Sequence, residues 1–351
     1  MSAAEEIRDA IAAAEAVGGQ RAIPFERFMD LALYGEHGFY TSGGGSAGRH
    51  GDFITSPEVG PLFGAVLARA LDGWWRDLGE PAHFTVVEAG AGPGTLARSV
   101  LATAPACTAA LWYVAVEVSA AQRSMHPDGI ESVPAMPAEP FTGVIIANEL
   151  LDNLPFRLFV MDGGWREAYV VDRGDGTFAE ILRAAPDAAA LPLPSHAPHG
   201  ARVPVQQRAA EWVHTSRALL QKGRLVVIDY ASATTAALAL RPWREWLRTY
   251  RGHSRGDHYL RDPGGQDITA EVAVDQIGAV NGVPDAVRAQ SQFLQRWGID
   301  ALVSAGQQYW AEHATAPTLA ALTMRSRVRE AEALLADPGL GSFLVIEYAK
   351  P

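Results

Sequence analysis

The sequence predicts a Rossmann-like α/β fold with a largely parallel central sheet. A run of β-type residues at 84–87 leads into glycines at alternate positions and then into a helix. This order of strand, turn and helix holds nucleotide-like ligands at the carboxyl edge of such a sheet. Further apolar runs at 111–117, 143–147 and 224–230 have the composition of parallel strands that are buried on both faces.

The glycine turn carries information about its ligand. A dinucleotide fingerprint needs the spacing Gly-x-Gly-x-x-Gly, whereas here Gly90, Gly92 and Gly94 bring the third glycine one residue early. Glu88 precedes the turn, where a carboxylate would repel a pyrophosphate but would suit a cationic amino acid tail. S-adenosyl-L-methionine has such a tail, so it is favoured over a nicotinamide cofactor; a glycine turn without a ligand is the alternative.

Polar side chains end the next two predicted strands. Glu117 lies in register with the glycine turn, where an acid can accept both ribose hydroxyls of a cofactor; otherwise it is a solvated strand end. Asn148, Glu149 and Asp152 follow the strand at 143–147, where the substrate is expected. Asn148 would alternatively cap a helix that begins at Glu149, and the two roles are compatible.

The residues before the first sheet strand, 1–82, predict a helical extension with a glycine-rich pocket loop. Helices are expected at 3–17 and from Pro24. The glycine-dense stretch 35–52 predicts a loop that is either mobile or ordered by a ligand.

The stretch after this loop allows a structural and a functional interpretation. Thr55 or Ser56 can cap a helix that opens at Pro57. The functional interpretation is that Asp52, Thr55 and Ser56 form one wall of the cofactor or substrate pocket.

Three further regions follow the extension. We expect a core at 83–235 with a hairpin insertion at 156–204, a mainly helical substrate or cap region at 236–340, and a final core strand within 341–351. Further predicted elements are a hairpin of 157–161 with 165–171, a surface loop at 184–204, helices at 206–220, 268–280 and 298–336, and a returning strand at 287–294.

Composition excludes several classes of protein. The net charge of −11 argues against a general nucleic-acid or anionic-membrane binder, and no run of 18 apolar residues suggests membrane insertion. Cys107 is the only cysteine, so neither a disulfide framework nor a cysteine metal site is expected, and the loop residues His196 and His199 do not predict a metal site.

The first 17 residues carry four acids, unlike a secretory or transit peptide, which predicts a cytoplasmic protein. Arginine far outnumbers lysine, which is typical of a GC-rich bacterial genome.

Several stretches together resemble the MidA-like S-adenosyl-L-methionine-dependent methyltransferases, a family that includes the mitochondrial complex I assembly methyltransferase. The stretches 51–58 (Gly-Asp-Phe-Ile-Thr-Ser-Pro-Glu) and 148–155 (Asn-Glu-Leu-Leu-Asp-Asn-Leu-Pro) are the most specific. The other matching stretches are 24–29, 33–35, 38–40, 63–64, 88–92, 247–253, 265–270, 292–299 and 337–341. Two positions depart from the family's pattern, because Ala231 stands for a glycine and Glu271 for a histidine; the loop around 41–49 is also short.

The resemblance implies a class I methyltransferase sheet of seven strands, an N-terminal helical extension, a largely helical insertion and bound S-adenosyl-L-methionine. For the mitochondrial member it also implies arginine methylation on a respiratory complex I subunit. A guanidinium acceptor needs carboxylates to orient it, and arginine pairs with carboxylates in bidentate geometry.

The site residues follow from this chemistry. We expect Glu149 to orient the acceptor, with Asp52 or Asp152 as the second carboxylate and Asn148 positioning the acceptor through its carbonyl. His253 is either a proton acceptor or a structural histidine. The acidic total charge suits an arginine-bearing protein substrate.

Two other functions stay open at this point. The chain could be a small-molecule O- or N-methyltransferase whose insertion covers a small pocket. It could also be a non-catalytic assembly factor that binds S-adenosyl-L-methionine. The apolar helices offer a surface for a homodimer contact.

Overall fold

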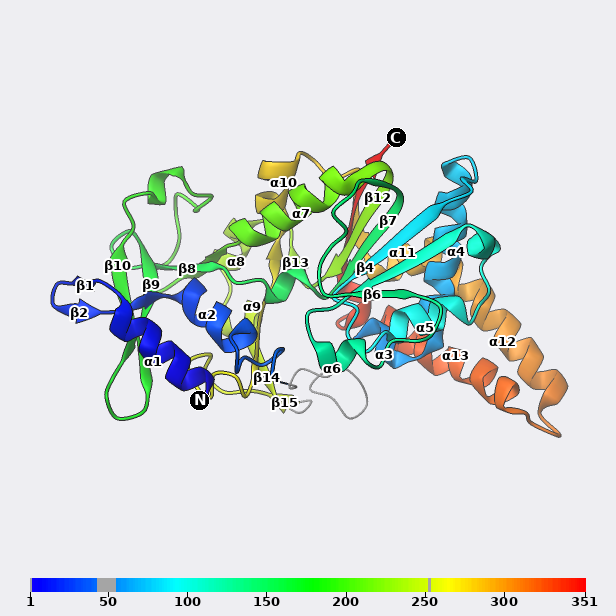
Figure 1. Ribbon diagram of the computed structural model, residues 1–351, viewed down its shortest axis with the longest axis horizontal. Helices are drawn as coiled ribbons and strands as arrows, with labels where there is room; N and C mark the ends of the chain where they lie inside the picture. Colours follow the sequence, from blue (N-terminus) through cyan, green and yellow to red (C-terminus); the bar gives the residue numbers. More distant parts are fainter. Residues whose placement is uncertain (1, 43–54, 252–253) are drawn as a thin grey trace.

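The computed structural model describes residues 2–42, 55–251 and 254–351, so the predicted site residues Asp52 and His253 lie outside the described part. Its central sheet has seven strands in the order β18-β19-β12-β7-β4-β5-β6 (Figure 1). The strands are β4 (Phe84–Ala89), β5 (Leu111–Val116), β6 (Glu131–Val133), β7 (Phe141–Asn148), β12 (Leu220–Asp229), β18 (Ala286–Ala289) and β19 (Leu344–Lys350). Neighbouring strands are parallel except β19, which runs antiparallel to both β12 and β18. The predicted sheet is therefore confirmed.

Helices cover both faces of this sheet, which explains why its strands are apolar on both sides. One face carries α3 (Ser56–Val59), α4 (Pro61–Asp77), α5 (Thr95–Leu101), α11 (Gln290–Arg296), α12 (Ile299–His313) and α13 (Leu319–Leu335). The other face carries α7 (Gln207–Leu219) and α10 (Val274–Asn281). In β4, Val86 packs into the first layer and Val87 into the second, and both are fully buried.

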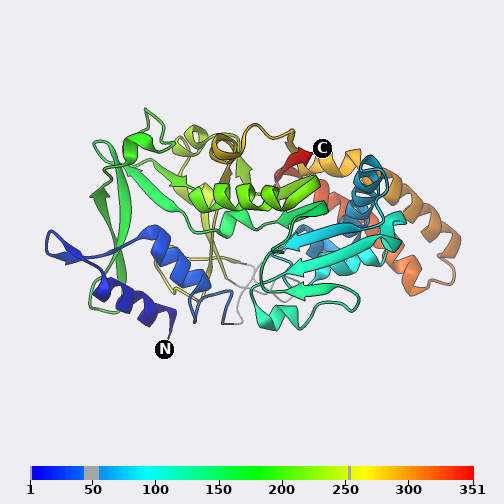
Figure 2. The same cartoon turned by 45° about the horizontal axis from the view of Figure 1, so that its top comes forward.

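A second sheet builds the other end of the molecule (Figure 2). It has the order β10-β9-β8-β11, with β3 paired to β9. Its strands are β3 (Ile23–Pro24), β8 (Arg157–Met161), β9 (Trp165–Asp172), β10 (Phe178–Ala184) and β11 (Arg202–Val205). The helices α1 (Ala3–Ala13) and α2 (Phe25–Tyr34) pack on it through a buried cluster that includes Phe25, Phe28 and Phe156. We call this unit the antiparallel lobe.

Four local predictions need correction. The first helix ends at Ala13, and residues 16–21 form the small hairpin of β1 (Ala16–Val17) and β2 (Gln20–Arg21). The predicted hairpin at 157–171 exists, but the loop predicted at 184–204 ends in strand β11, which pairs with β8. The strand predicted at 287–294 is short, because α11 begins at Gln290.

The helix predicted at 268–280 is wrong in its first half. Residues there form β16 (Asp267–Ala270) and β17 (Val272–Ala273), and only α10 is helical. β16 pairs with β14 (Leu247–Arg251), so a long-range partner overrides the local helical pattern.

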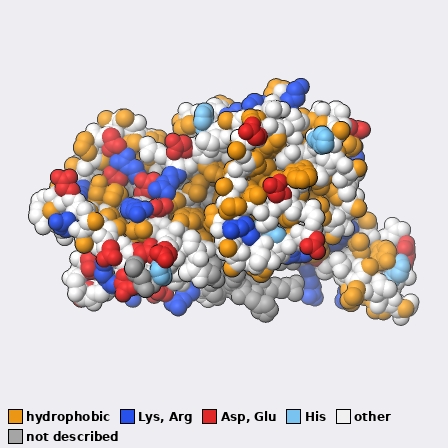
Figure 3. Space-filling model, viewed as in Figure 1, with side chains coloured by type: hydrophobic (Ala, Val, Ile, Leu, Met, Phe, Trp, Pro, Cys, Tyr) orange, Lys and Arg blue, Asp and Glu red, His pale blue; other side chains and the backbone are white. Residues whose placement is uncertain are grey.

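The remaining elements are short. They are α6 (Ala120–Arg123), α8 (Thr235–Ala239), α9 (Trp243–Trp246), β13 (Ala231–Ser232), β15 (Ser254–Arg255) and 3₁₀ turns at Ala106–Ala109, Leu151–Asn153, Ala188–Ala190 and Leu340–Ser342. Within the described residues, no helix has the length and apolar character that crossing a membrane requires. On the face drawn in Figure 3, basic side chains gather over the antiparallel lobe, with acidic side chains among them.

Candidate active site

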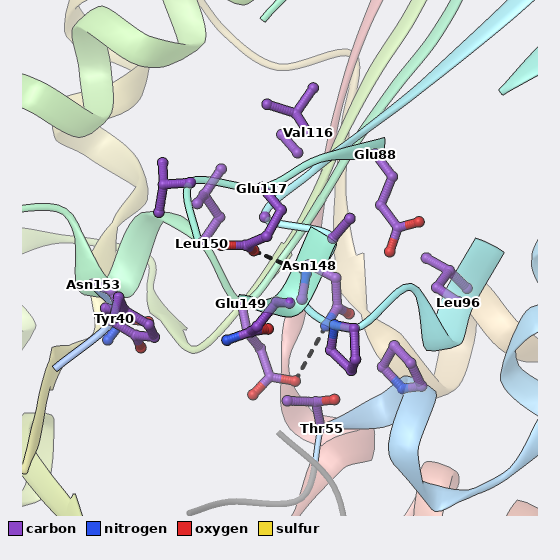
Figure 4. Close-up of a pocket in the computed structure, with 18 of the residues that line it drawn as sticks. Tyr40, Thr55, Glu88, Leu96, Val116, Glu117, Asn148, Glu149, Leu150 and Asn153 are labelled. Atoms are coloured by element: carbon purple, nitrogen blue, oxygen red, sulfur yellow. Dashed lines mark hydrogen bonds between the residues drawn. The ribbon is translucent and has the colours of Figure 1, made fainter. Parts of the chain in front are cut away.

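A cavity of about 350 Å³ opens at the carboxyl edge of the central sheet. The glycine turn after β4, the residue after β5 and the end of β7 line it, and Tyr34 and Tyr40 from the N-terminal extension close one side. Figure 4 shows Glu149 between Asn148 and Thr55, with Tyr40 to one side and Glu88 on the opposite side. Several predicted site residues line this cavity, namely Thr55, Glu88, Gly90, Gly92, Glu117, Asn148 and Glu149, whereas Gly94, Ser56 and Asp152 do not.

The glycine turn and Glu117 form one rigid unit. Gly92 has φ of +53°, a conformation that favours glycine, and its backbone N–H donates to Glu117 Oε2 at 3.0 Å. The backbone N–H of Ser119 donates to Glu117 Oε1 at 2.8 Å. Because each oxygen accepts one hydrogen bond from the described residues, lone pairs are available there for the two hydroxyls of a ribose. A Cβ at Gly92 would also lie 3.2 Å from Gln122 Oε1, so the close approach depends on glycine.

Glu88 lies at the far end of the cavity and is 5% exposed. The hydroxyl of Tyr113 donates to Glu88 Oε2 at 2.6 Å. Burial raises the pKa of Glu88 to about 7, against the opposing effects of Tyr113 and the backbone N–H of Ala97. The Glu88 carboxyl is thus tied to β5 and to the first turn of α5.

Glu149 sits in a strained backbone conformation directly after β7. Its φ is +52°, which disfavours any side chain and costs about 1–3 kcal/mol. The backbone N–H of Glu149 donates to the carbonyl of Ile228 in β12 at 2.8 Å, which fixes this geometry. The predicted helix from Glu149 is absent; a 3₁₀ turn at Leu151–Asn153 follows instead.

The Glu149 carboxylate faces the cavity beside Asn148. Its Oε1 accepts long hydrogen bonds from Asn148 Nδ2 (3.3 Å) and the backbone N–H of Ser56 (3.4 Å). Burial and the nearby Asp152 raise the pKa of Glu149 to about 8. The oxygen Asn148 Oδ1 is buried and has no hydrogen-bond partner among the described residues. A buried acceptor of this kind is normally satisfied, so a ligand donor is expected there.

Three more buried carboxyl groups lie behind Glu149. Asp229 ends β12 and accepts from the backbone N–H groups of Leu151 (2.9 Å) and Asp152 (3.3 Å). Asp152 accepts from the hydroxyl of Thr269. Burial is the main cause that raises the pKa of Asp152 to about 6 and the pKa of Asp229 well above its ordinary value. One oxygen on each of these carboxyl groups has no hydrogen-bond partner among the described residues.

The fourth carboxyl group links this cluster to the N-terminal extension. Asp267 Oδ1 accepts from Tyr40 Oη (3.1 Å) and from Asn153 Nδ2 (2.9 Å). The Tyr40 ring stacks on Tyr34 with centroids 5.5 Å apart. Burial and Asp152 raise the pKa of Asp267 to about 7. We call Glu149, Asp152, Asp229 and Asp267 the carboxyl cluster.

Thr55 and Ser56 have different places. Thr55 lines the cavity and occupies the N-cap position of α3 without a side-chain cap hydrogen bond. Ser56 is fully buried and its hydroxyl donates to Gln290 Oε1 at 2.9 Å, so only its backbone N–H reaches Glu149.

The sequence reasoning missed several residues of the site. Asp229 is the last residue of strand β12, and Glu117 directly follows strand β5. An acidic residue at the end of a predicted strand was the signal that identified Glu117, and it could also have identified Asp229. Tyr40 lies in the predicted glycine-rich loop and Asp267 in a stretch noted for its resemblance, and 227 residues separate them, so no local pattern pairs them. Pro134, Met136 and Trp212 add an apolar wall that no motif marks.

The cavity fits a nucleoside with a charged tail on chemical grounds. Glu117 offers fixed acceptors for a ribose, and Val116, Met136 and Trp212 give an apolar wall for a base. The unpartnered Asn148 Oδ1 and the Glu149 carboxylate face the same space. These residues match S-adenosyl-L-methionine, which combines an adenosine, a sulfonium cation and an amino acid.

Comparisons with known proteins agree with this geometry. Residues 66–283 match the family model Methyltransf_28, described as "putative S-adenosyl-L-methionine-dependent methyltransferase". The chain is 28% identical over 289 residues to a Drosophila melanogaster protein named protein arginine methyltransferase NDUFAF7 homolog, mitochondrial, and 25% identical over 304 residues to its Homo sapiens counterpart. These alignments cover 71% and 72% of this chain but only 64% and 65% of the relatives.

A solved structure extends the likeness to nearly the whole chain. A COG1565 superfamily protein from Burkholderia thailandensis, bound to S-adenosyl-homocysteine, is 29% identical with a TM-score of 0.84. The superposition covers 99% of this chain and 92% of that one. The family model and the structural match together place the sequence: it belongs to the MidA-like family of S-adenosyl-L-methionine-dependent methyltransferases.

Proposed function

We propose that this protein transfers a methyl group from S-adenosyl-L-methionine to the guanidinium group of an arginine in a protein substrate. The observation that carries the proposal is the carboxyl cluster, whose member Glu149 faces the cofactor cavity beside Asn148. A guanidinium remains cationic at any physiological pH, so a buried group of carboxylates is a fitting counter-charge. The names of the relatives, protein arginine methyltransferases, point the same way.

The cofactor end of the site offers partners for several parts of the ligand. When bound, S-adenosyl-L-methionine supplies an electrophilic methyl group on a sulfonium sulfur. Glu117 would accept the ribose hydroxyls, and the turn of Gly90, Gly92 and Gly94 would let the ligand approach the backbone closely. Asn148 Oδ1 would accept a hydrogen bond from the ligand.

The acceptor end would orient and deprotonate the guanidinium. Glu149, with its raised pKa, would become ionised beside the incoming cation and pair with it. Glu149 would then accept the proton that the acceptor nitrogen loses as the nitrogen–carbon bond forms and the carbon–sulfur bond breaks, with its electron pair left on sulfur. Asp152 and Asp229 would act on the acceptor through space rather than by contact, because both are buried and neither lines the cavity.

Other parts of the proposal rest on the sequence. Asp52 and His253 lie outside the described residues, so their roles as second carboxylate and proton acceptor stay predictions. A cytoplasmic location likewise stays a prediction. A respiratory complex subunit is a candidate substrate, and the helices α12 and α13 are candidates for a homodimer contact.

The decisive experiment is transfer of a tritiated methyl group into a lysate of a strain that lacks the gene. We expect label in a protein band and, after acid hydrolysis, in methylarginine. Label only in small molecules would instead identify a small-molecule methyltransferase. Calorimetry first establishes binding, with NAD as the negative control; a protein that does not bind S-adenosyl-L-methionine would end the proposal.

An assembly factor needs a separate comparison. The Glu149→Gln variant should keep cofactor binding and lose transfer. If this variant fully complements the deletion strain, methyl transfer is not needed for the biological role, and a role as an assembly factor gains support.

A further inference from the structure

A second groove opens at the same edge of the central sheet, beside the acceptor end of the site. It has a volume of about 550 Å³. It is lined by Tyr230 and Ala231 after β12, by Arg248 and Glu271, and by the turn 338–343 that leads into β19. We call it the β12 groove. Ala231 and Glu271, the two positions that depart from the family's pattern, both lie in its wall.

The β12 groove and the proposed acceptor site are joined by the end of strand β12. Ile228 of β12 lies opposite Asn148 of β7 in the sheet register, and its carbonyl accepts from Glu149 at 2.8 Å. Tyr230 follows two residues later, and burial, followed by the negative charge of Glu149, raises the pKa of its hydroxyl. A chain segment whose side chain reaches Glu149 can therefore extend along this groove.

The carboxylate in the wall of the groove is already neutralised. Glu271 receives both terminal nitrogens of Arg241 at 2.8 and 2.7 Å, and Arg248 Nη2 lies 3.2 Å away. Its side chain is only 10% exposed. Glu271 has little capacity left to bind a cation, so it does not make the groove a basic-residue site.

Arg248 is held in place but keeps unused donors. Its Nε donates to the carbonyl of Glu245 at 2.6 Å, and its guanidinium lies 5.4 Å from the ring centroid of Tyr230. Neither Arg248 Nη1 nor the Tyr230 hydroxyl has a hydrogen-bond partner among the described residues. The groove thus presents free donors and a positive charge beside the apolar side chains of Leu340 and Phe343.

From these observations we infer that the β12 groove binds the stretch of the acceptor protein next to the methylated residue and selects an acidic side chain there through Arg248. The inference rests on the proposed function. A carboxylate is the group that best satisfies a pre-positioned guanidinium with free N–H donors, because the hydrogen bond is charge-assisted. Glu149 would thus bind the arginine of the acceptor protein, and Arg248 would bind the acidic residue next to that arginine.

A purely structural role for Arg248 makes a different prediction. Arg248 also acts on Asp152 and lowers its pKa, so its loss could slow transfer without any role in recognition. That effect would be the same for every substrate. A recognition role instead changes the ratio of rates between substrates that differ only beside the arginine.

The test uses the full chain, tritiated S-adenosyl-L-methionine and a peptide library with one fixed arginine and degenerate flanking positions. Sequencing the labelled pool should show enrichment of Asp or Glu at one flanking position. For peptides made from that result, we expect kcat/KM to be about tenfold higher with the acid than with the matching amide. The Arg248→Gln variant should bring this ratio close to one, and Arg248→Glu should favour a basic residue at the same position.

Two further variants keep the result interpretable. Arg248→Lys keeps the charge, so it should retain part of the preference even if Arg248→Gln folds poorly. Arg251→Gln removes an arginine from the same strand whose 69% exposed side chain pairs with Asp262, and the ratio should stay as in the native protein.

The outcomes separate the two proposals. Equal rates for acidic and neutral flanks in the native protein, or a preference that survives in Arg248→Gln, would overturn the role of the groove while leaving arginine methylation intact. Absence of label from every arginine peptide, despite cofactor binding, would overturn arginine methylation and with it this inference.

Discussion

The two ends of the active-site cavity are built in opposite ways. At the cofactor end, Glu117 accepts backbone hydrogen bonds on both oxygens and Glu88 accepts from Tyr113. At the acceptor end, Asp152 and Asp229 each leave a buried oxygen without a partner among the described residues, and Glu149 sits at positive φ. Glu117 and Glu88 thus have hydrogen-bond partners before any ligand arrives, whereas the acceptor end holds a strained residue and buried carboxyl groups whose ionised forms a cation would favour.

This contrast explains how one cavity can serve two ligands. A pre-formed cofactor end needs little rearrangement to bind, so its residues should control affinity. The buried carboxyl groups of the acceptor end interact most strongly with a charged acceptor. The residues of this end should therefore control kcat. Each prediction below separates the two ends.

The largest effect is expected for Glu149→Gln. Loss of the orienting carboxylate should lower kcat roughly 10³-fold, which lies within the range for a positioned proton acceptor. The dissociation constant of S-adenosyl-L-methionine, measured by calorimetry, should change less than about threefold because the cofactor end is intact. Glu58→Gln removes another carboxylate of the cavity wall and should leave kcat close to native. A Glu149 variant that loses affinity and keeps kcat would reverse the assignment.

Glu117→Ala should give the converse result. It removes the acceptors for the ribose and leaves the backbone N–H groups of Gly92 and Ser119 without their partner. Charge-assisted hydrogen bonds of this kind are worth about 1.5–3 kcal/mol, so cofactor affinity should fall about tenfold to a hundredfold. At saturating cofactor, kcat should stay within a few-fold of native. An unchanged dissociation constant would place the ribose elsewhere.

The third prediction concerns stability and pH. The pKa values of Glu149 (about 8), Asp267 (about 7) and Asp152 (about 6) are raised by folding. Between pH 5 and 8 the native state therefore binds more protons than the unfolded state, so the free energy of unfolding falls as the pH rises. Glu149→Gln removes one of these groups, so the free energy of unfolding of the variant should fall less as the pH rises.

Urea unfolding at two pH values checks this prediction. At pH 8 the Glu149→Gln variant should be more stable than the native protein by roughly 4 kcal/mol, and at pH 5 by less than about 1 kcal/mol. The variant would then gain stability where it loses activity. If the variant is destabilised by the same amount at both pH values, folding does not raise the pKa of Glu149.

The same contrast decides what the sequence could predict. The glycine turn, Glu88 and Glu117 follow one another within two βα units, so spacing alone places them in one site. The partners of the acceptor end come from distant segments: Asp267 meets Tyr40 across 227 residues, and Asp152 meets Thr269 across 117. Only the folded chain brings these together.

The incorrect local predictions have the same cause. A helix was expected at Glu149 because the pattern of Asn148, Glu149 and Asp152 is typical of a helix start. The hydrogen bond from Glu149 to Ile228 imposes a positive φ that no local signal encodes. Residues 268–270 likewise become a strand because β14 lies beside them. Strain at a functional site is the feature that local propensity is least able to predict.

The smallest expected effect comes from the tyrosine pair that joins the N-terminal extension to the acceptor end. Tyr40 donates to the carboxylate of Asp267 at 3.1 Å, whereas Tyr34 donates to the neutral carbonyl of Asn153 at 3.3 Å. The Tyr40 hydrogen bond favours the ionised form of Asp267 and lowers a pKa that burial holds at about 7. Its contribution is therefore present above that pH and fades as the pH falls. Tyr40→Phe should cost about 1 kcal/mol of unfolding free energy at pH 8.5 and less at pH 5.5, measured by urea unfolding.

Tyr34→Phe is the matched control, because its loss of unfolding free energy should be the same at both pH values. Equal pH dependence in the two variants would mean that Asp267 is not charged at neutral pH, and the acceptor end would then carry less negative charge than its four carboxyl groups suggest.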